Sequence, residues 1–297
     1  MESPFKRLAW PICKQRMDGL TKTLQISGYK SDCGATDFEL KCDTSSVRTH
    51  GWYHEHEFTY RQKQYRLVVT NSLPDHCTSV DQVRANPNMP CEKLKAMFVP
   101  VNPEKGDSLL EWGMGAIGIS TTGTMIYNHK SAEAECNAAA ISEANTLDSC
   151  AGHADAQCNY HYHALPNCAT GSDSCKLMGY MRDGFPIYGH CTVTFADGLT
   201  LEMASNYYQI DGTSGCDTSH YTYDPNVAGG SLDDANGYAF TQDATGGSVT
   251  FPAGTYAYFF TPTYPFSQIG YYGVTYKRDG SVKTAASLCE FSLSDLQ

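Results

Sequence analysis

The chain has 297 residues, of which 26 are glycine, 20 tyrosine and 12 phenylalanine, and it carries a formal net charge of −11. Nucleic acids and anionic membranes are disfavoured as partners, because both would repel so acidic a protein. No apolar run approaches the roughly 20 residues of a transmembrane helix. The length suits one large domain or two small ones, and the glycine and aromatic content predicts a β-rich globule.

Thirteen cysteines are scattered along the chain instead of being gathered into repeated Cys-x-x-Cys pairs. This distribution predicts a disulfide framework and therefore an oxidising, extracellular location. The residues after Met1 are too polar for a signal peptide, so we interpret the chain as a mature secreted protein whose signal peptide has been removed. The odd cysteine count leaves one thiol unpaired or linked to a second chain. We expect a monomer, with a disulfide-linked dimer as the alternative.

In chain order, residues 1–46 are predicted to form a Cys-rich N-terminal cap, and residues 47–297 a mainly β domain. Residues 52–74 alternate aromatic or apolar with polar side chains, which is the pattern of a half-buried hairpin. This hairpin carries a His-x-His pair, His54 and His56. We interpret the pair as an exposed strand face, because no third histidine lies near it in sequence.

The next segments contain two predicted strands and one predicted helix. Prolines predict an irregular connection over residues 85–107, because each proline lacks a backbone donor. Residues 113–120 and 121–128 are predicted to be glycine-bearing strands around a tight turn. Residues 131–147 are rich in alanine and form the best predicted helix, whose acidic side chains would give it a solvated face.

The most informative stretch of the sequence contains three histidines. His161 and His163 are two residues apart, so in a strand both imidazoles project from one face, while Tyr160 and Tyr162 project from the other. A tight hairpin would bring His153 back beside them as a third nitrogen ligand. Three neutral imidazoles with an open position suit zinc, copper or iron, and the spacing does not choose among these metals.

Two further residues complete this predicted site. Asp148 is expected to accept a hydrogen bond from one imidazole and so orient it. His190 is the predicted fourth ligand, because it directly follows the Asp-Gly-Phe-Pro-Ile-Tyr-Gly sequence at 183–189. The alternatives are a purely structural polar core and metal-free acid–base catalysis by histidine.

The centre of the sequence is repeated in a degenerate form further along the chain. Residues 147–153 align with 232–238, and residues 160–166 align without a gap with 256–262. Tyr238, Ala257 and Phe259 then stand in the places of His153, His161 and His163. This alignment predicts two similar β halves, the first at about 65–195 and the second at about 196–285.

In the second half, aromatic side chains replace the histidines and predict an apolar hollow. Such a hollow favours a flat organic substrate, because ring stacking adds to the burial of apolar surface. The predicted wall of this pocket consists of Tyr238, Phe259, Tyr264, Tyr271 and Tyr272.

Several of these motifs together resemble the YHYH-domain family. They are the Asp-x-Cys-x-Gly-His sequence at 148–153, Tyr-His-Tyr-His at 160–163 and the sequence at 183–189, with further matches at 70–76 and 114–128. The resemblance covers roughly residues 65–275 and implies a fold and a candidate site, since the family has no well-established reaction. It also implies a place for His76 in the site.

The fold class that follows is mainly β, with antiparallel, sandwich-like sheets in two similar halves, few short helices and stabilising disulfides.

The first functional interpretation is a secreted oxidoreductase or oxygenase that uses O₂ on a small organic, possibly aromatic, substrate at the histidine-held metal. A secreted luciferase is one instance of such an enzyme. The second is a zinc-dependent hydrolase with Asp148, Asp155 or Asp183 as general base. The third is a non-enzymatic extracellular module that binds metal or carbohydrate.

Overall fold

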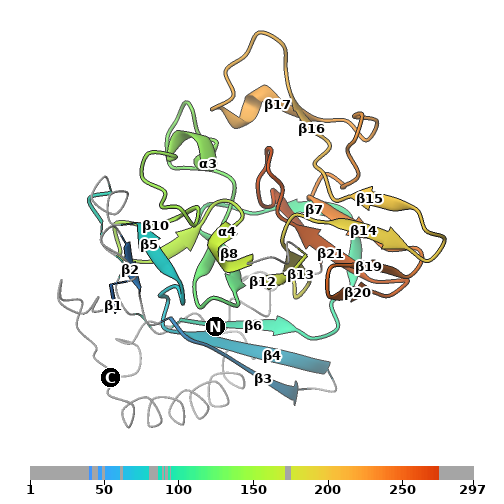
Figure 1. Ribbon diagram of the computed structural model, residues 1–297, viewed down its shortest axis with the longest axis horizontal. Helices are drawn as coiled ribbons and strands as arrows, with labels where there is room; N and C mark the ends of the chain where they lie inside the picture. The colour runs from blue at the N-terminus through green and yellow to red at the C-terminus, as the bar shows by residue number, and fades with distance from the viewer. Residues whose placement is uncertain are drawn as a thin grey trace, which may run out of the picture.

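A computed structural model describes residues 40–41, 46–48, 51–60, 63–79, 86–88, 90, 93, 95–170 and 175–273 (Figure 1). The predicted Cys-rich cap therefore lies outside the described residues, apart from fragments at its end. None of the helices within these ranges has the length and apolarity that a membrane crossing requires.

The fold is mainly β, as predicted, and is organised around a central sheet of eight strands (Figure 1). In the order in which neighbours are hydrogen-bonded, these strands are β10 (Gly152–Ala154), β11 (Tyr160–Tyr162), β9 (Met125–Tyr127), β8 (Ala116–Ser120), β12 (Leu177–Met181), β13 (Pro186–Tyr188), β21 (Tyr256–Phe259) and β18 (Gly237–Ala239).

The two halves of this sheet are built in the same way. Each begins with an antiparallel hairpin, β8–β9 or β12–β13, and then receives a strand that runs parallel to the hairpin's second member, β11 or β21. An antiparallel edge strand, β10 or β18, completes each half. Because β8 and β12 pair antiparallel at the centre, the two halves are related by an approximate two-fold arrangement.

The turn that precedes each edge strand is held by an aspartate with the same hydrogen bonds in both halves. Asp148 Oδ1 accepts from the backbone of Cys150 and Gly152, and its Oδ2 accepts from the Tyr160 hydroxyl at 2.5 Å. The equivalent atoms of Asp233 accept from two backbone N–H groups and from the Tyr256 hydroxyl at 2.9 Å. The two aligned segments of the sequence are therefore structural counterparts.

The hairpins are counterparts as well, which extends the correspondence to residues 118–128 and 179–189. Gly123 and Gly184 occupy the same turn position with φ of 96° and 95°, a left-handed conformation that favours glycine. Thr121 N donates to Met178 O, and the equivalent Arg182 N donates to Ile117 O, so the two turns hold each other across the centre of the sheet.

Smaller sheets surround the central one. The predicted hairpin at 52–74 is confirmed as β3 (Tyr53–Tyr60) and β4 (Lys63–Thr70), which form a sheet with β6 (Lys95–Pro100). A four-stranded sheet contains β15 (Thr200–Glu202), β14 (Thr192–Phe195), β19 (Ala244–Gly246) and β20 (Val249–Phe251). A three-stranded sheet contains β1 (Leu40–Lys41), β2 (Ser46–Arg48) and β5 (Cys77–Ser79), in that order. Two further sheets have two strands each: β7 (Lys105–Glu111) pairs with β22 (Gly270–Gly273), and β16 (Tyr207–Gln209) pairs with β17 (Tyr221–Tyr223).

The four-stranded sheet covers one face of the second half of the central sheet. Side chains alternate along β21, so Tyr256 and Tyr258 enter one apolar cluster, whereas Ala257 and Phe259 enter another. The second cluster contains Val193, Phe195 and Phe251 from the four-stranded sheet. Phe259 is completely buried there. This layer explains why the second half carries apolar residues at the positions of the histidines.

Helices are short, as predicted, but the best predicted helix is much shorter than its sequence suggests. Only α3 (Ala139–Ser142) is helical within residues 131–147. Lys130 forms an isolated bridge with Ala138, and Cys136 has a φ of 58°, so the first part of the segment is a loop. The other short helices of the described chain are α4 (Asn167–Thr170) and the 3-10 helix η1 (Thr218–His220).

The segment 85–107, predicted to be irregular, also differs from its prediction, because it contains β6 and the start of β7.

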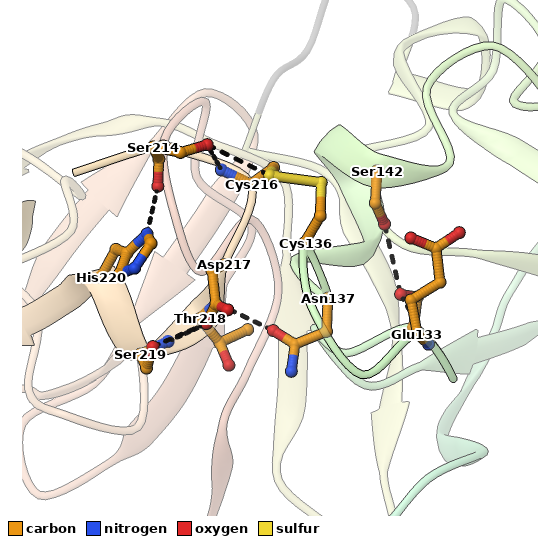
Figure 2. The surroundings of a disulfide bond; sticks show 12 residues. Glu133, Cys136, Asn137, Ser142, Ser214, Cys216, Asp217, Thr218, Ser219 and His220 are labelled. Carbon is orange, nitrogen blue, oxygen red and sulfur yellow. Dashed lines mark hydrogen bonds between the residues drawn. A yellow bond between two sulfur atoms is a disulfide. The ribbon is translucent and has the colours of Figure 1, made fainter.

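Three disulfides stabilise the described part of the chain, as the cysteine distribution predicted. They join Cys136 to Cys216, Cys150 to Cys168, and Cys175 to Cys191, whereas Cys158 is free. Figure 2 shows the first of them tying the loop before α3 to the segment that contains η1, beside a hydrogen bond from Thr218 N to Asn137 Oδ1. Closing loops of this kind contributes about 3–5 kcal/mol per bond in the chain-entropy model.

The matched turns predict the effect of substituting Gly237. A Cβ atom at this position would overlap the Tyr256 hydroxyl, which Asp233 holds in place. We expect Gly237→Ala to lower the free energy of unfolding by about 1–3 kcal/mol, measured by urea denaturation with the disulfides intact. Gly113→Ala is the control, because nothing lies within 4 Å of its Cβ position. Equal stability of the two variants would contradict the role assigned to this turn.

Candidate metal centre

Three histidines converge on one face of the first half of the central sheet. His153 of β10 pairs directly with His161 of β11, and His163 follows two residues later on the same face. The Nε2 atom of His161 lies 3.0 Å from the Nε2 atom of His153 and 3.0 Å from that of His163. The ligand atoms of all three lie within 4.8 Å of one another.

The opposite nitrogen of each imidazole is held by a hydrogen-bond acceptor. His161 Nδ1 lies 3.0 Å from the carbonyl oxygen of Asn159, and His163 Nδ1 lies 3.0 Å from that of Asn128. A carbonyl oxygen only accepts, so these two Nδ1 atoms carry the proton. His153 Nδ1 lies 2.8 Å from the hydroxyl of Thr146, which itself donates to a carbonyl and therefore accepts from the imidazole.

These bonds direct the Nε2 atoms toward the centre of the cluster. Burial, reinforced by the two neighbouring imidazoles, holds the pKa of His161 well below its ordinary value, so this ring is neutral. Its Nε2 therefore presents a lone pair to the other two Nε2 atoms at 3.0 Å. A proton or a metal ion shared with these atoms would satisfy that lone pair.

Glu143 places a carboxylate beside the three histidines, which the sequence did not predict. Its buried Oε2 lies 3.2 Å from Nε2 of both His153 and His163. Burial acts to raise the pKa of Glu143, but contact with the two imidazoles outweighs it and lowers this pKa below its ordinary value. The side chain is therefore a carboxylate. Residue 143 caps α3 instead of lying on the solvated face of a longer helix, so helical periodicity misplaced it.

Two of the nitrogen–nitrogen separations in the cluster are compatible with ligands of one ion. Two nitrogens at about 2.05 Å from a first-row metal lie about 2.9 Å apart at a right angle and about 3.4 Å apart at the tetrahedral angle. The observed 3.0 Å contacts fall within this interval. The three histidines therefore form a group that could hold a metal ion, and Glu143 lies beside it.

The cluster is closed on one side and reaches the surface on the other. The His163 side chain is 3% exposed, whereas those of His153 and Glu143 are 11% and 24% exposed. A small hollow lies beside the exposed edge. It is lined by Asn86, Asn88, Pro90, Thr146, Asp148, Gly152, His153, Ala154 and Tyr160.

Two residues of the predicted site have other roles in the structure. The Asp148 carboxylate accepts from two backbone N–H groups and from Tyr160, so it fixes the turn before β10. The prediction that Asp148 accepts a hydrogen bond from an imidazole was therefore wrong. His190 lies apart from the cluster, because its Nε2 pairs with the exposed carboxylate of Glu202 at 2.9 Å. The carboxylate that lies beside the three histidines is that of Glu143.

The other histidines singled out in the sequence lie outside the cluster. His54 and His56 are exposed on β3, in agreement with their interpretation as a strand face. His76 is buried, and its Nε2 lies 2.5 Å from the Tyr162 hydroxyl. It forms a second group of donor atoms with Cys150 and Cys168, but the two sulfurs are joined in a disulfide and are not available to a metal.

The aromatic residues predicted to line a substrate pocket are distributed over separate parts of the core. Phe259 lies under the four-stranded sheet, Tyr271 lies in the opposite cluster, and Tyr264 belongs to a third one. Tyr238 and Tyr272 are partly buried against two of these clusters. Within the described chain these rings fill the core, because the four-stranded sheet occupies the space of the predicted hollow.

Neither of the other carboxylates considered as a general base faces the histidines. Asp183 belongs to the second half, where it accepts from the Tyr258 hydroxyl at 2.6 Å and from Gly273 N at 2.9 Å. Burial raises the pKa of Asp183 to about 6, against the effect of these hydrogen bonds. Asp155 accepts from Tyr127 and Asn159 in the turn between β10 and β11.

Of the comparisons with known proteins, the one with family models gives a match. No curated protein and no solved structure matches the chain. The family model described as YHYH protein matches residues 96–273, which is more than half of the sequence. This span contains both halves of the central sheet and all four residues of the candidate metal centre. The chain therefore belongs to the YHYH family.

Proposed function

We propose that this protein is an extracellular metalloenzyme that holds one first-row transition ion on His153, His161, His163 and Glu143. The observation that carries the proposal is the convergence of three imidazole Nε2 atoms and one carboxylate oxygen of Glu143. Neutral imidazoles would place lone pairs and a negative charge in mutual contact, which is costly at buried positions without a cation. These four residues would then hold the ion.

The set of ligands supports a redox-active ion. Imidazole nitrogens suit copper, iron, nickel and zinc, and a carboxylate adds a hard oxygen that iron and manganese also accept. Nitrogen separations of 3.0 Å correspond to angles near 90°, which leave further coordination positions for water, O₂ or substrate. We therefore propose an oxidoreductase that uses O₂ on a small organic substrate. When bound, the ion would supply O₂ binding and electron transfer.

The residues around the cluster support access from one direction. The buried side, formed by His161 and His163, excludes water, while the edge at His153 and Glu143 is partly exposed. A small organic molecule would approach along this edge. An extracellular location is supported by the three disulfides, since such bonds persist mainly in oxidising compartments.

A zinc-dependent hydrolase is the second candidate, and the position of Glu143 is the observation that favours it. In a three-histidine zinc site, a carboxylate close to the metal can take a proton from bound water. Glu143 lies 3.2 Å from two ligand nitrogens, whereas the aspartates first considered as bases are engaged elsewhere. A site that holds zinc and shows no turnover would support the non-enzymatic module instead.

Removal of one ligand tests the metal centre. We expect the purified, disulfide-intact protein to contain about one metal ion per chain by elemental analysis, and His161→Ala to contain almost none. His190→Ala is the matched control, because its imidazole pairs with Glu202 outside the cluster. Wild-type protein without metal after reconstitution, or metal retained in His161→Ala, would refute the assignment.

The carboxylate is tested separately by removing its charge. We expect Glu143→Gln to weaken metal binding by at least tenfold in a chelator competition, because the amide is neutral and a poorer ligand. Glu135→Gln removes an exposed charge from the loop before α3 and should bind metal like the wild type. Equal affinities for the two variants would show that Glu143 is not a ligand.

Spectroscopy and O₂ uptake distinguish the candidate reactions. A redox-active ion predicts a visible or paramagnetic resonance signal and consumption of O₂ with phenolic or other small aromatic substrates. Zinc predicts no signal and, for the hydrolase, cleavage of ester substrates. We expect the first result, and a colourless protein that contains stoichiometric zinc and consumes no O₂ would overturn the oxidoreductase assignment.

A further inference from the structure

The imidazole of His161 is held by two groups besides any metal. The ring of Tyr127 stacks on it with centroids 3.7 Å apart and planes inclined by 15°. At the ring edge, the carbonyl oxygen of Asn159 accepts from His161 Nδ1 at 3.0 Å. One contact fixes the plane of the imidazole, and the other fixes its rotation within that plane.

Both groups are themselves bound by one carboxylate, that of Asp155. The Tyr127 hydroxyl donates to Asp155 Oδ2 at 2.8 Å. Asn159 donates to Oδ1 from its backbone at 2.9 Å and from its side-chain amide at 3.1 Å. Gln157 N also donates to Oδ1 at 2.9 Å, so the carboxylate closes the whole turn between β10 and β11.

We propose that Asp155 is the positioning residue of the metal centre and that it sets the orientation and electronic character of His161 through Tyr127 and Asn159. The inference rests on the proposed metal site. It gives Asp155 the role that the sequence had suggested for Asp148. Groups that hydrogen-bond directly to a ligand histidine typically change metal affinity by 10–100-fold when they are removed, and Asp155 acts on His161 through one intervening residue on each path.

The charge of Asp155 also acts on the ring that stacks on the ligand. A phenol that donates to a carboxylate becomes more electron-rich, since the hydrogen bond to an ionised acceptor polarises its O–H group. Burial, together with the charge of Asp155, raises the pKa of Tyr127 and keeps the phenol protonated as the donor. An electron-rich ring against His161 would shift the energy levels of a bound ion.

The second half of the sheet separates this role from simple packing. Tyr188 occupies the position of Tyr127 in the equivalent hairpin, so an aromatic ring here is part of the duplicated fold. Phe240 stands at the position of Asp155, two residues after Tyr238, and it packs on Phe251 in the apolar core. The tyrosine is thus common to both halves, whereas the carboxylate occurs in the half that carries histidines.

Copper provides a probe for the test, since Cu²⁺ reports both affinity and ligand geometry. Wild type, Asp155→Asn and Tyr127→Phe would be stripped, loaded with Cu²⁺ and compared by chelator competition and paramagnetic resonance. We expect Asp155→Asn to bind Cu²⁺ 10–100-fold more weakly. Tyr127→Phe keeps the stacked ring but loses the hydrogen bond, so we expect a changed copper spectrum with a smaller loss of affinity.

Two controls separate positioning from general destabilisation. Tyr188→Phe alters the equivalent tyrosine of the other half, and Asp197→Asn alters an exposed aspartate that also accepts from a backbone N–H two residues on. Both should retain wild-type affinity and spectrum. Circular dichroism checks folding, and if Asp155→Asn does not fold, the spectrum of Tyr127→Phe decides the question.

The outcomes also distinguish this inference from the proposed function. Wild-type affinity and an unchanged spectrum in folded Asp155→Asn would overturn the role of Asp155 while leaving the metal centre intact. An unchanged spectrum in Tyr127→Phe would overturn the electronic effect. Wild-type protein that binds no Cu²⁺ and no other first-row ion would overturn both the centre and the positioning residue.

Discussion

The candidate site depends on hydrogen bonds at the outer nitrogen of each imidazole. Asn159 and Asn128 each present a carbonyl oxygen that only accepts, and Thr146 presents a hydroxyl whose proton is already donated. The Nε2 atoms therefore face each other. Because β10 and β11 place His153 opposite His161, the pairing of two short strands brings these atoms together. Glu143 adds a carboxylate beside them, and the proposed ion would satisfy all four groups.

The duplicated sheet shows why one half holds this site and the other does not. The same face carries His161 and His163 in the first half, and Ala257 and Phe259 in the second. In the second half a four-stranded sheet covers that face, so polar side chains there would be buried without partners. In the first half the turn that follows α3 contributes Glu143 and Thr146, which place a carboxylate and a hydrogen-bond acceptor beside the histidines.

Sequence periodicity predicted the strands and the shared face of the histidines, because an alternation of two residues fixes which side chains point together. It predicted the correspondence around Asp148 and Asp233 but not that of the two hairpins, where little beyond the spacing of two glycines and an Ile-Tyr pair survives. Periodicity could not predict the position of Glu143, because α3 ends after one turn and Glu143 is its C-cap residue. His190 was misplaced because nearness in sequence to the Asp-Gly-Phe-Pro box says nothing about which face a residue joins.

Covalent and polar constraints hold the site in place independently of a metal. The Cys150–Cys168 disulfide and the Asp148 carboxylate fix the turn before His153, while Asp155 fixes the turn before His161. The Cys136–Cys216 bond anchors the loop that delivers Glu143. A centre prepared in this way would lose little conformational freedom on binding the proposed ion, so more of the ligand-bond energy would be available as affinity. The same ion would satisfy the lone pairs that the fold brings together.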